Sequence, residues 1–300
     1  MKKISHAFLF LILASLPARA DMVDANMYNV TEQYSRALNE YMKEANKGNT
    51  ASYYWIGTLH YYGHGTKQDY AKAIDWLLKA ATDDGENGSP EAMALLGDIH
   101  YNGYGLDKNI NNALQYYSNA ANLGHAQSGF VVGNLYAQGV DGIDVNLANS
   151  LLYWEQAAVN GHVRAMHNAG YLYETGLAGL KDHDKAYSLY LMAAEKDYTP
   201  SQMKVGIYAK NFETKRDYDI ALKYLTIVAQ KKQPLAQHEL SVMYENGLGV
   251  EKDVVTAAAW LISAAKIDAK TNEADRDKLL ATLTPDQKTK ANAMATAFGF

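Results

Sequence analysis

Small and bulky apolar residues recur along this chain with the spacing of one buried helical face, and the pattern returns every 35 to 40 residues. A small residue stands five positions before a central column of glycines, and a bulky residue stands two positions after it. The central column consists of Gly57, Gly97, Gly133, Gly170, Gly206 and, with serine in place of glycine, Ser241. Each copy is therefore predicted to begin with a helix, termed helix A, that has one apolar side.

A second recurring pattern lies downstream and predicts another helix, termed helix B. An Asp or Asn precedes a small residue by four positions; an aromatic residue or leucine follows three later, and an alanine five after that. The six Asp or Asn residues are Asp69, Asn109, Asn146, Asp182, Asp217 and Asp253. Such side chains accept hydrogen bonds from the free N–H groups of a first helical turn, a cap worth about 1 kcal/mol. Six helix pairs are therefore predicted, because neither helix can bury its apolar stripe alone.

The glycines have two predicted roles. Gly57 lies inside helix A, where glycine costs about 1 kcal/mol relative to alanine, so we interpret it as a point of close approach. We expect Trp76, and Tyr116 in the next copy, to fill the space beside these glycines. Gly63 and Gly65 follow the helix and predict the left-handed backbone of a tight turn.

The two ends and two irregularities complete the pattern. Residues 37–48 copy the helix B pattern of residues 113–124 and predict an N-terminal capping helix. Thr284, Pro285 and Gln287 mark another helix start, which with residues 272–281 predicts two closing helices. The fifth copy lacks both turn glycines, and the link at 82–90 is longer than its counterparts, so either place could bend the array.

The predicted fold is therefore all-α: a right-handed superhelical α-solenoid of six helix-pair repeats with N- and C-terminal capping helices. We assign a signal peptide to residues 1–20 and an N-terminal capping helix to residues 21–50. The six repeats occupy residues 51–265, and residues 266–300 form the C-terminal capping helices.

The first twenty residues have the organisation of a secretory signal. Lys2 and Lys3 precede an apolar stretch over residues 7–16, and Ala18-Arg19-Ala20 has the small-x-small form of a cleavage site. A membrane-anchored N-terminus is the alternative, but the stretch is short for a membrane span. We expect cleavage near Ala20, a periplasmic or secreted protein, and no stable membrane anchoring.

Composition excludes several classes of protein. The chain has no cysteine, which rules out a lipidated cysteine, a disulfide scaffold and a thiol nucleophile. Cleavage of the predicted signal peptide removes Lys2, Lys3 and Arg19 from the 28 basic residues. The mature chain then has 25 basic and 33 acidic residues, a formal net charge of −8. An acidic surface disfavours nucleic acid and anionic membranes as partners.

These columns resemble the Sel-one-like repeat family, relatives of the tetratricopeptide repeats. The resemblance is best preserved over residues 95–126 and 239–265. It implies an adaptor or scaffold that binds another protein. Its exported bacterial members include immunity proteins that neutralise effector enzymes, so an immunity or inhibitory protein that neutralises a secreted effector enzyme is the first alternative for this chain. Some cysteine-rich relatives are associated with peptidoglycan or penicillin binding and β-lactam hydrolysis. This chain lacks their paired cysteines, so we predict a non-enzymatic protein and keep a cell-wall or β-lactam hydrolase as the less favoured alternative.

A search for chemical motifs supports the same prediction. The sequence contains no nucleophile elbow, no zinc-protease motif, no phosphate-binding loop and no dinucleotide fingerprint, so we predict no catalytic residues and no cofactor. His60 and His64 have the spacing of two metal ligands on one helical face. Because His60 shares its column with tyrosines, we interpret it as a packing residue and predict no metal site.

Helical geometry predicts where a partner binds. Relative to the central glycine, positions −2, +1 and +5 of helix A lie opposite the packing face and would line the inner, concave side of the array. We call these positions the helix A lane. Its predicted partner-binding residues are Trp55, Tyr62, Asn102, Asn134, Asn168, Tyr171 and Asn246. We expect these amides and aromatic rings to bind a protein or peptide of unknown identity, with an effector enzyme or a signalling protein as candidates. The alternative is an ordinary solvated helix face.

Overall fold

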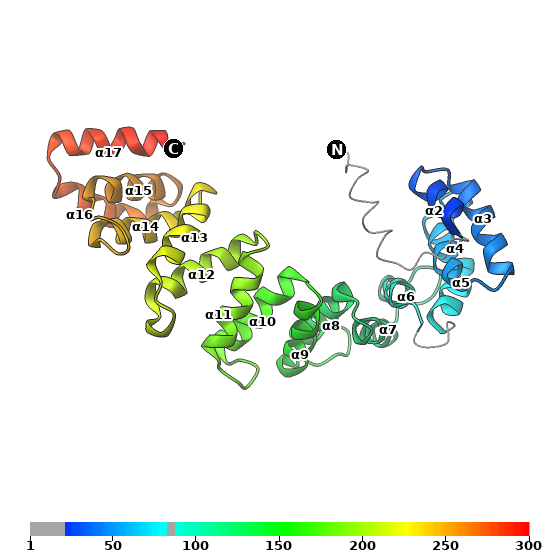
Figure 1. The fold of residues 1–300 in the computed structure, drawn as a ribbon. Coiled ribbons are helices and arrows are strands. Elements are labelled where there is room, and N and C mark those ends of the chain that lie inside the picture. Colours follow the sequence, from blue (N-terminus) through cyan, green and yellow to red (C-terminus); the bar gives the residue numbers. More distant parts are fainter. Residues whose placement is uncertain (1–21, 83–87, 300) are drawn as a thin grey trace. The chain divides into compact units, whose positions relative to one another are not determined.

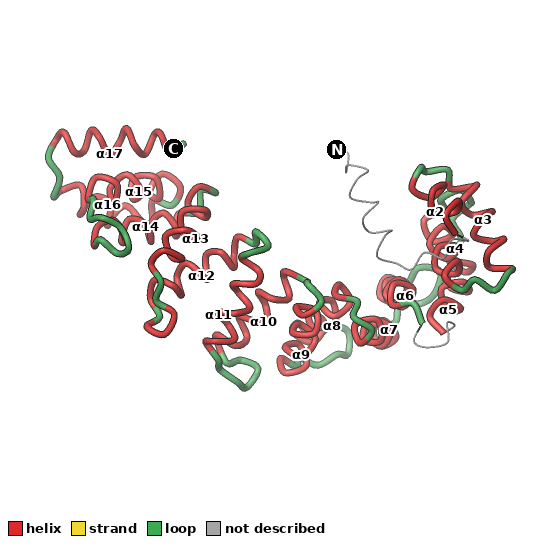
Figure 2. The backbone as a smooth tube through the Cα atoms, in the orientation of Figure 1, coloured by secondary structure: helices red, strands yellow, loops and turns green. Residues whose placement is uncertain are grey.

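Helix accounts for all the regular secondary structure that the computed structural model describes, over residues 22–82 and 88–299 (Figures 1 and 2). That part of the chain forms sixteen α-helices and one short 3₁₀ helix, which confirms the all-α prediction. The right-handed sense of the superhelix stays a prediction. The predicted signal peptide and most of the long 82–90 link lie outside the described residues.

Six helix pairs follow one another along the chain, and in each pair helix A packs against helix B. The helices A are α4 (Ala51–Tyr62), α6 (Pro90–Asn102), α8 (Ala126–Gln138), α10 (Val163–Thr175), α12 (Thr199–Asn211) and α14 (Pro234–Asn246). The helices B are α5 (Tyr70–Thr82), α7 (Ile110–Asn122), α9 (Leu147–Val159), α11 (His183–Ala194), α13 (Tyr218–Gln230) and α15 (Val254–Ile267). The chain divides into two units, Met1–His162 and Val163–Phe300, each with three of the six pairs.

The predicted caps of helix B are confirmed in all six pairs. The Asn109 side chain accepts a hydrogen bond from the backbone N–H of Asn112 at 2.9 Å, and Asp253 accepts from two backbone N–H groups. Asp69, Asn146, Asp182 and Asp217 make the equivalent bond. Each cap satisfies a backbone donor that has no partner within the helix.

The glycine column of helix A is a point of close approach, as predicted, but the residue that fills the space differs. A Cβ atom added to Gly57 would lie 2.7 Å from Leu77, and one added to Gly97 would lie 2.6 Å from the Tyr117 ring. The prediction that Trp76 and Tyr116 fill this space is therefore wrong by one position. One helical turn takes 3.6 residues, so the residue four after the small column lies on nearly the same side of helix B and faces helix A. Trp76 and Tyr116 lie at the edge of this contact and are only partly buried.

The turn glycines have the predicted conformation and also a second role. Gly63 and Gly65 have φ of 70° and 71°. A Cβ atom on Gly65 would lie 2.4 Å from the backbone of Tyr34, and one on Gly105 would lie 2.6 Å from Tyr70. Tyr34 and Tyr70 begin helices that precede these turns in the chain, so the second glycine also lets each turn pack on the preceding pair.

Each end of the chain carries two helices. The predicted N-terminal capping helix is α3 (Tyr34–Asn46), and a shorter helix that the sequence pattern did not predict, α2 (Val23–Val30), packs against it. The closing helices are α16 (Ala269–Ala281) and α17 (Pro285–Ala297); both pack on α15. The predicted capping box of Thr284 and Gln287 is present. The altered connection of the fifth repeat is also confirmed, because a 3₁₀ helix (Glu213–Lys215) replaces its glycine turn.

The close approach at Gly97 generates a stability prediction. We expect Gly97→Ala to lower the free energy of unfolding by about 1–2 kcal/mol, because overpacking against Tyr117 exceeds the gain in helix propensity. Urea denaturation followed by circular dichroism measures this change. Gln115→Ala, at an exposed position of α7, is the control and should change stability by less than about 0.5 kcal/mol. An increase in the stability of Gly97→Ala would show that the glycine is not needed for packing.

Candidate functional site

The structure places the seven predicted partner-binding residues on the helices A of both units. Trp55, Tyr62, Asn102 and Asn134 belong to the first unit, on α4, α6 and α8. Asn168, Tyr171 and Asn246 belong to the second unit, on α10 and α14. Asn134 and Asn168 are partly buried, whereas Tyr62, Asn102, Tyr171 and Asn246 are exposed.

Exposure differs between the three positions of the helix A lane. Position +5 is exposed in every repeat, where it is held by Tyr62, Asn102, Gln138, Thr175, Asn211 and Asn246. Position +1 varies, from the exposed Asp98 and Tyr171 to the partly buried Asn134. Position −2 is partly or fully buried in every repeat, and Leu95 is the most buried example. The open edge of the lane therefore follows the C-terminal ends of the helices A.

In three repeats, a side chain of an earlier helix contacts position −2. Trp55 stacks on Tyr41 of α3, with ring centroids 6.0 Å apart and ring planes within 7° of parallel. In the second unit, Lys204 pairs with Glu174 of α10 at 2.7 Å, and Glu239 pairs with Lys210 of α12. Sequence reasoning assigned position −2 to the lane because it treated each helix A without its neighbours.

The amides at the helix ends bond to their own helix. The Asn102 side-chain amide donates to the carbonyl of Asp98 at 2.8 Å, and Asn246 donates to Val242 at the same distance. The Thr175 hydroxyl donates in the same way to Tyr171. These bonds satisfy carbonyl groups in the last turn of the helix. Part of the amide content of the lane therefore serves helix termination.

Exposed rings are the strongest recognition feature of the lane. Tyr62 is 55% exposed and Tyr171 is 45% exposed. Tyr62 packs edge-on against Tyr61, with ring centroids 4.8 Å apart, and Tyr61 in turn contacts Tyr70 and Tyr104. Burial and the nearby carboxylate of Asp98 raise the pKa of Tyr61 to about 12, so its hydroxyl stays neutral. This cluster joins the turns of two consecutive repeats, a proximity that no single repeat reveals.

Two carboxylates on helices A are held by tyrosines of helix B. The Tyr117 hydroxyl donates to Asp98 Oδ1 at 2.6 Å, and the Tyr190 hydroxyl donates to Glu174 Oε2 at 2.7 Å. Although the Asp98 residue as a whole is exposed, desolvation of its carboxyl group raises the pKa, and the hydrogen bond from Tyr117 opposes that shift. Each tyrosine passes over the central glycine of its repeat, so the close approach also positions charge beside the lane.

The histidines described next pack against other side chains of the fold. His60 is buried, while His64 is exposed and stacks on Tyr34 at 4.5 Å, so the two face different environments. His162 stacks on Phe130 with ring centroids 4.2 Å apart. Over residues 22–82 and 88–299, no three His, Asp or Glu side chains come together as a metal site would require.

His125 is the N-terminal cap of α8. Its Nδ1 accepts a hydrogen bond from the backbone N–H of Ser128 at 3.3 Å and lies 2.8 Å from the Ser128 hydroxyl. Because Nδ1 must accept, the cap requires an imidazole without a proton at that nitrogen. Burial lowers the pKa of His125 below its ordinary value of 6.5, although the carboxylates of Glu91 and Asp98 oppose this shift.

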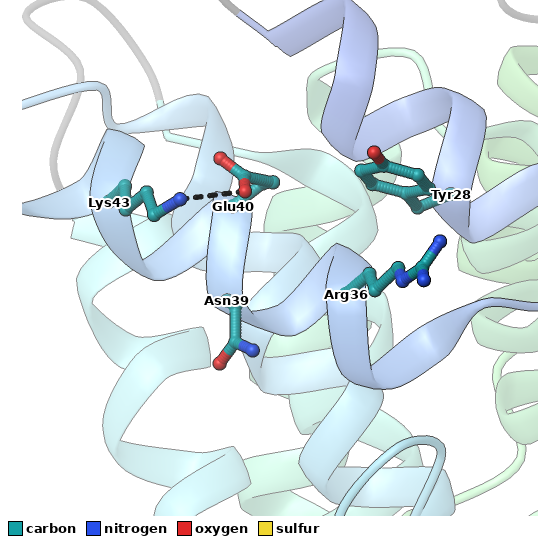
Figure 3. Close-up of a pocket in the computed structure, with 5 residues that line it drawn as sticks. All are labelled: Tyr28, Arg36, Asn39, Glu40 and Lys43. Carbon is teal, nitrogen blue, oxygen red and sulfur yellow. Dashed lines mark hydrogen bonds and ion pairs between the residues drawn. The ribbon is translucent and has the colours of Figure 1, made fainter.

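One shallow pocket lies away from the lane, on α2 and α3 (Figure 3). Its volume is about 430 Å³, and its lining combines Tyr28, Arg36, Asn39, Glu40 and Lys43. Lys43 pairs with Glu40 at 2.7 Å, and the Arg36 guanidinium lies 5.9 Å from the centroid of the Tyr28 ring. The charged groups of the pocket therefore already have partners within it.

Among the helices that the structure describes, none has the length and apolar character that crossing a membrane requires.

The His125 cap generates a prediction about pH. The unfolded chain binds a proton at His125 at higher pH than the folded chain does, so we expect stability to fall as pH drops below about 6.5. His125→Ser supplies a hydroxyl cap like that of Ser89 on α6, which does not titrate in this range. The loss of stability between about pH 7.5 and 5.5 should therefore be about 1 kcal/mol smaller in His125→Ser.

Urea denaturation at several pH values measures this difference. His60, His100 and His167, whose pKa values burial also lowers, remain in both proteins and provide the common background. Equal losses of stability in the two proteins would show that the His125 cap does not respond to protonation.

Comparisons with known proteins identify the repeated unit. A profile of the Sel1 repeat matches six segments: residues 50–84, 90–125, 130–162, 163–198, 199–231 and 234–267. The chain is 30% identical to a Sel1 repeat protein from Oxalobacter formigenes, with a TM-score of 0.56, covering 82% of this chain and 97% of that one. No curated protein matches the sequence significantly.

Two further solved structures are similar. A protective antigen present in uropathogenic Escherichia coli strains, which displays an SLR fold, is 24% identical with a TM-score of 0.61. The match covers 93% of this chain but 61% of the antigen, so this chain spans about three-fifths of its length. An immunity protein from Pseudomonas aeruginosa is 19% identical over 74% of this chain and 83% of that one. Its TM-score of 0.34 is too low to support an argument.

Proposed function

Because the chain belongs to the Sel1 repeat family, we propose that it is an exported, non-enzymatic scaffold that binds a protein or peptide partner through the helix A lane. The observation that carries this proposal is the exposure of position +5 in all six repeats, while position −2 is covered by neighbouring helices or by the chain's own ion pairs. Within each unit, a row of three equivalent exposed positions is the surface that packed helix pairs offer to an extended partner.

The chemistry of the lane supports protein recognition. Tyr62 and Tyr171 present large rings with polar hydroxyl groups, a type of side chain enriched among the residues that dominate interface energetics. Their two side-chain torsions mean that little conformational entropy is lost when they are ordered by a partner. The lane carries few free charges, because Lys204 and Glu239 are paired within the chain.

The surroundings of the side chains that could take part in catalysis support a binding role. The chain offers no thiol nucleophile, and burial raises rather than lowers the pKa of the Tyr117 and Tyr190 hydroxyls, which disfavours their ionised forms. His125 caps a helix and His162 stacks on a ring. Turnover of peptidoglycan or a β-lactam by the purified chain would contradict the non-enzymatic assignment.

Export is part of the proposal and has its own test. We expect the protein recovered from the periplasmic fraction to begin at Asp21, because Ala18 and Ala20 provide the small residues that signal cleavage requires. N-terminal sequencing checks this prediction. Replacement of Ala20 by Arg should leave the precursor uncleaved, whereas Asp21→Asn, immediately after the site, should be processed. Full-length protein in the cytoplasm would contradict export.

The lane itself is tested by changing its exposed rings. We expect Tyr62→Ala with Tyr171→Ala to reduce partner recovery from a periplasmic extract about tenfold, since truncation of an interface anchor typically costs more than about 1 kcal/mol. Affinity capture with quantitative mass spectrometry measures this loss. The matched control, Gln115→Ala with Ser188→Ala, changes exposed residues of helices B and should recover the same partner as the native protein. Equal recovery by all three proteins would place binding elsewhere.

A further inference from the structure

Each unit contains one helix A carboxylate that is held by a helix B tyrosine, and only the second unit adds a cation to it. The Tyr117 hydroxyl donates to Asp98 in the first unit. At the equivalent position of the second unit, the Tyr190 hydroxyl donates to Glu174. Lys204 of the next helix A pairs with Glu174 at 2.7 Å, and its Nζ lies 5.7 Å from the centroid of the Tyr190 ring. Counted from the central glycine, the two carboxylates are three positions apart, which is within one turn on the same side of helix A.

The first unit has the tyrosine and the carboxylate without the cation. Lys204 stands two residues before the central glycine of its repeat, and the equivalent residue in the helix A that follows Asp98 is Val131. Val131 packs in the apolar cluster that contains Tyr117. In the part of the chain that the structure describes, no lysine or arginine pairs with Asp98. The imidazole of His125 is near it, but burial holds the His125 pKa below 6.5, so this ring adds little positive charge at neutral pH.

The Asp98 carboxylate is accessible to a partner. The residue is exposed, and the bond from Tyr117 uses one acceptor position on Oδ1, so the carboxylate keeps further acceptor positions. Desolvation of the carboxyl group makes its charged form costly, as the raised pKa shows. Charges attract more strongly where water is partly excluded, so this carboxylate gains more from a cation than a fully hydrated one does.

Tyrosine rings lie near Asp98. Its carboxylate is close enough to raise the pKa of the Tyr61 hydroxyl. Tyr61 contacts three further rings, those of Tyr62, Tyr70 and Tyr104, with centroid distances of 4.8, 5.5 and 5.9 Å. Tyr62 and Tyr104 are 55% and 36% exposed. The faces of such rings attract ammonium and guanidinium groups, which adds a second attraction for a cation beside the carboxylate.

We propose that Asp98 and the rings of Tyr61, Tyr62 and Tyr104 bind a cationic side chain, arginine or lysine, of the protein partner. We call these four residues the Asp98 site. The proposal rests on the proposed function, because Asp98 holds position +1 of the helix A lane, and it adds that the partner presents a basic segment there. The negative net charge expected for the mature chain would attract such a segment over a longer range.

Nuclear magnetic resonance titration of the mature protein with the peptide acetyl-Gly-Arg-Gly-amide tests the site. We expect saturable shifts of the backbone amides of Asp98 and Tyr62. The same peptide with citrulline in place of arginine has a similar shape without the charge, and it should bind at least about tenfold more weakly. Equal binding of the two peptides, or the absence of a saturable shift at Asp98, would overturn the proposal.

Asp98→Asn removes the charge and keeps an oxygen that can accept from Tyr117. We expect this variant to keep the native circular dichroism spectrum and to bind acetyl-Gly-Arg-Gly-amide at least about tenfold more weakly. The matched control is Asp75→Asn, which makes the same change at an exposed position of α5 and should bind like the native chain. Unchanged binding by Asp98→Asn would show that the carboxylate is not the binding group.

Val131→Lys tests the comparison between the two units. It places a lysine at the position of Lys204, so we expect its ammonium group to lower the pKa of Asp98 and to weaken peptide binding at least about tenfold. Carbon-detected titration of the Asp98 carboxyl group measures the pKa, and Val131→Met is the uncharged control that should change neither quantity. An unchanged pKa would overturn the comparison, and a lowered pKa with unchanged binding would overturn the site.

Affinity capture from a periplasmic extract separates this proposal from the proposed function. We expect Asp98→Asn to recover less partner than Asp75→Asn. If a partner requires Tyr62 and Tyr171 but is recovered equally by Asp98→Asn, the lane stands and the Asp98 site is wrong. If the native protein recovers no partner, the proposed function fails, whereas charge-dependent binding of acetyl-Gly-Arg-Gly-amide would still support the Asp98 site.

Discussion

The contact between the central glycine of helix A and a large side chain of helix B is the constraint on which the first five repeats depend. At Gly97 and Gly133 even one added carbon atom would meet an aromatic ring, of Tyr117 and Trp154 respectively. The loss of helix propensity at each glycine is small compared with the burial of a whole ring or leucine side chain. The tolerance for different partners, from leucine to tryptophan, shows that the glycine defines the distance between the helices and leaves the choice of side chain open.

This close approach also shapes the proposed binding surface. Because the rings pass over the glycine, the hydroxyls of Tyr117 and Tyr190 reach the carboxylates of Asp98 and Glu174 on the helices A. The Tyr41 ring of α3 then covers Trp55, and Glu174 of α10 pairs with Lys204, so position −2 is occupied by contacts within the chain. What remains for a partner is the edge formed by the last residue of each helix A, together with rings such as Tyr171. The surface available for recognition is thus narrower than a helical wheel indicates.

The outer sides of the helices B vary for a different reason. Most carry polar residues that keep them in water, α15 is covered by α16 and α17, and α9 exposes apolar side chains. Repeats that share one internal packing pattern can therefore carry different surfaces, because the outer positions do not contribute to the contact between helix A and helix B.

The amino-acid pattern was sufficient to predict the number of helix pairs, their caps and their turns, because these features depend on interactions within a few residues of the chain. The Asp and Asn caps, the left-handed glycines and the Thr284 capping box are all local and were all found. Tertiary structure decided which side chains meet between helices. It placed Leu77 rather than Trp76 against Gly57, packed Trp55 on Tyr41, and joined the rings of consecutive turns. These contacts depend on the rotation and spacing of neighbouring helices. A rotation of a few tens of degrees about the helix axis decides whether a side chain is buried or exposed.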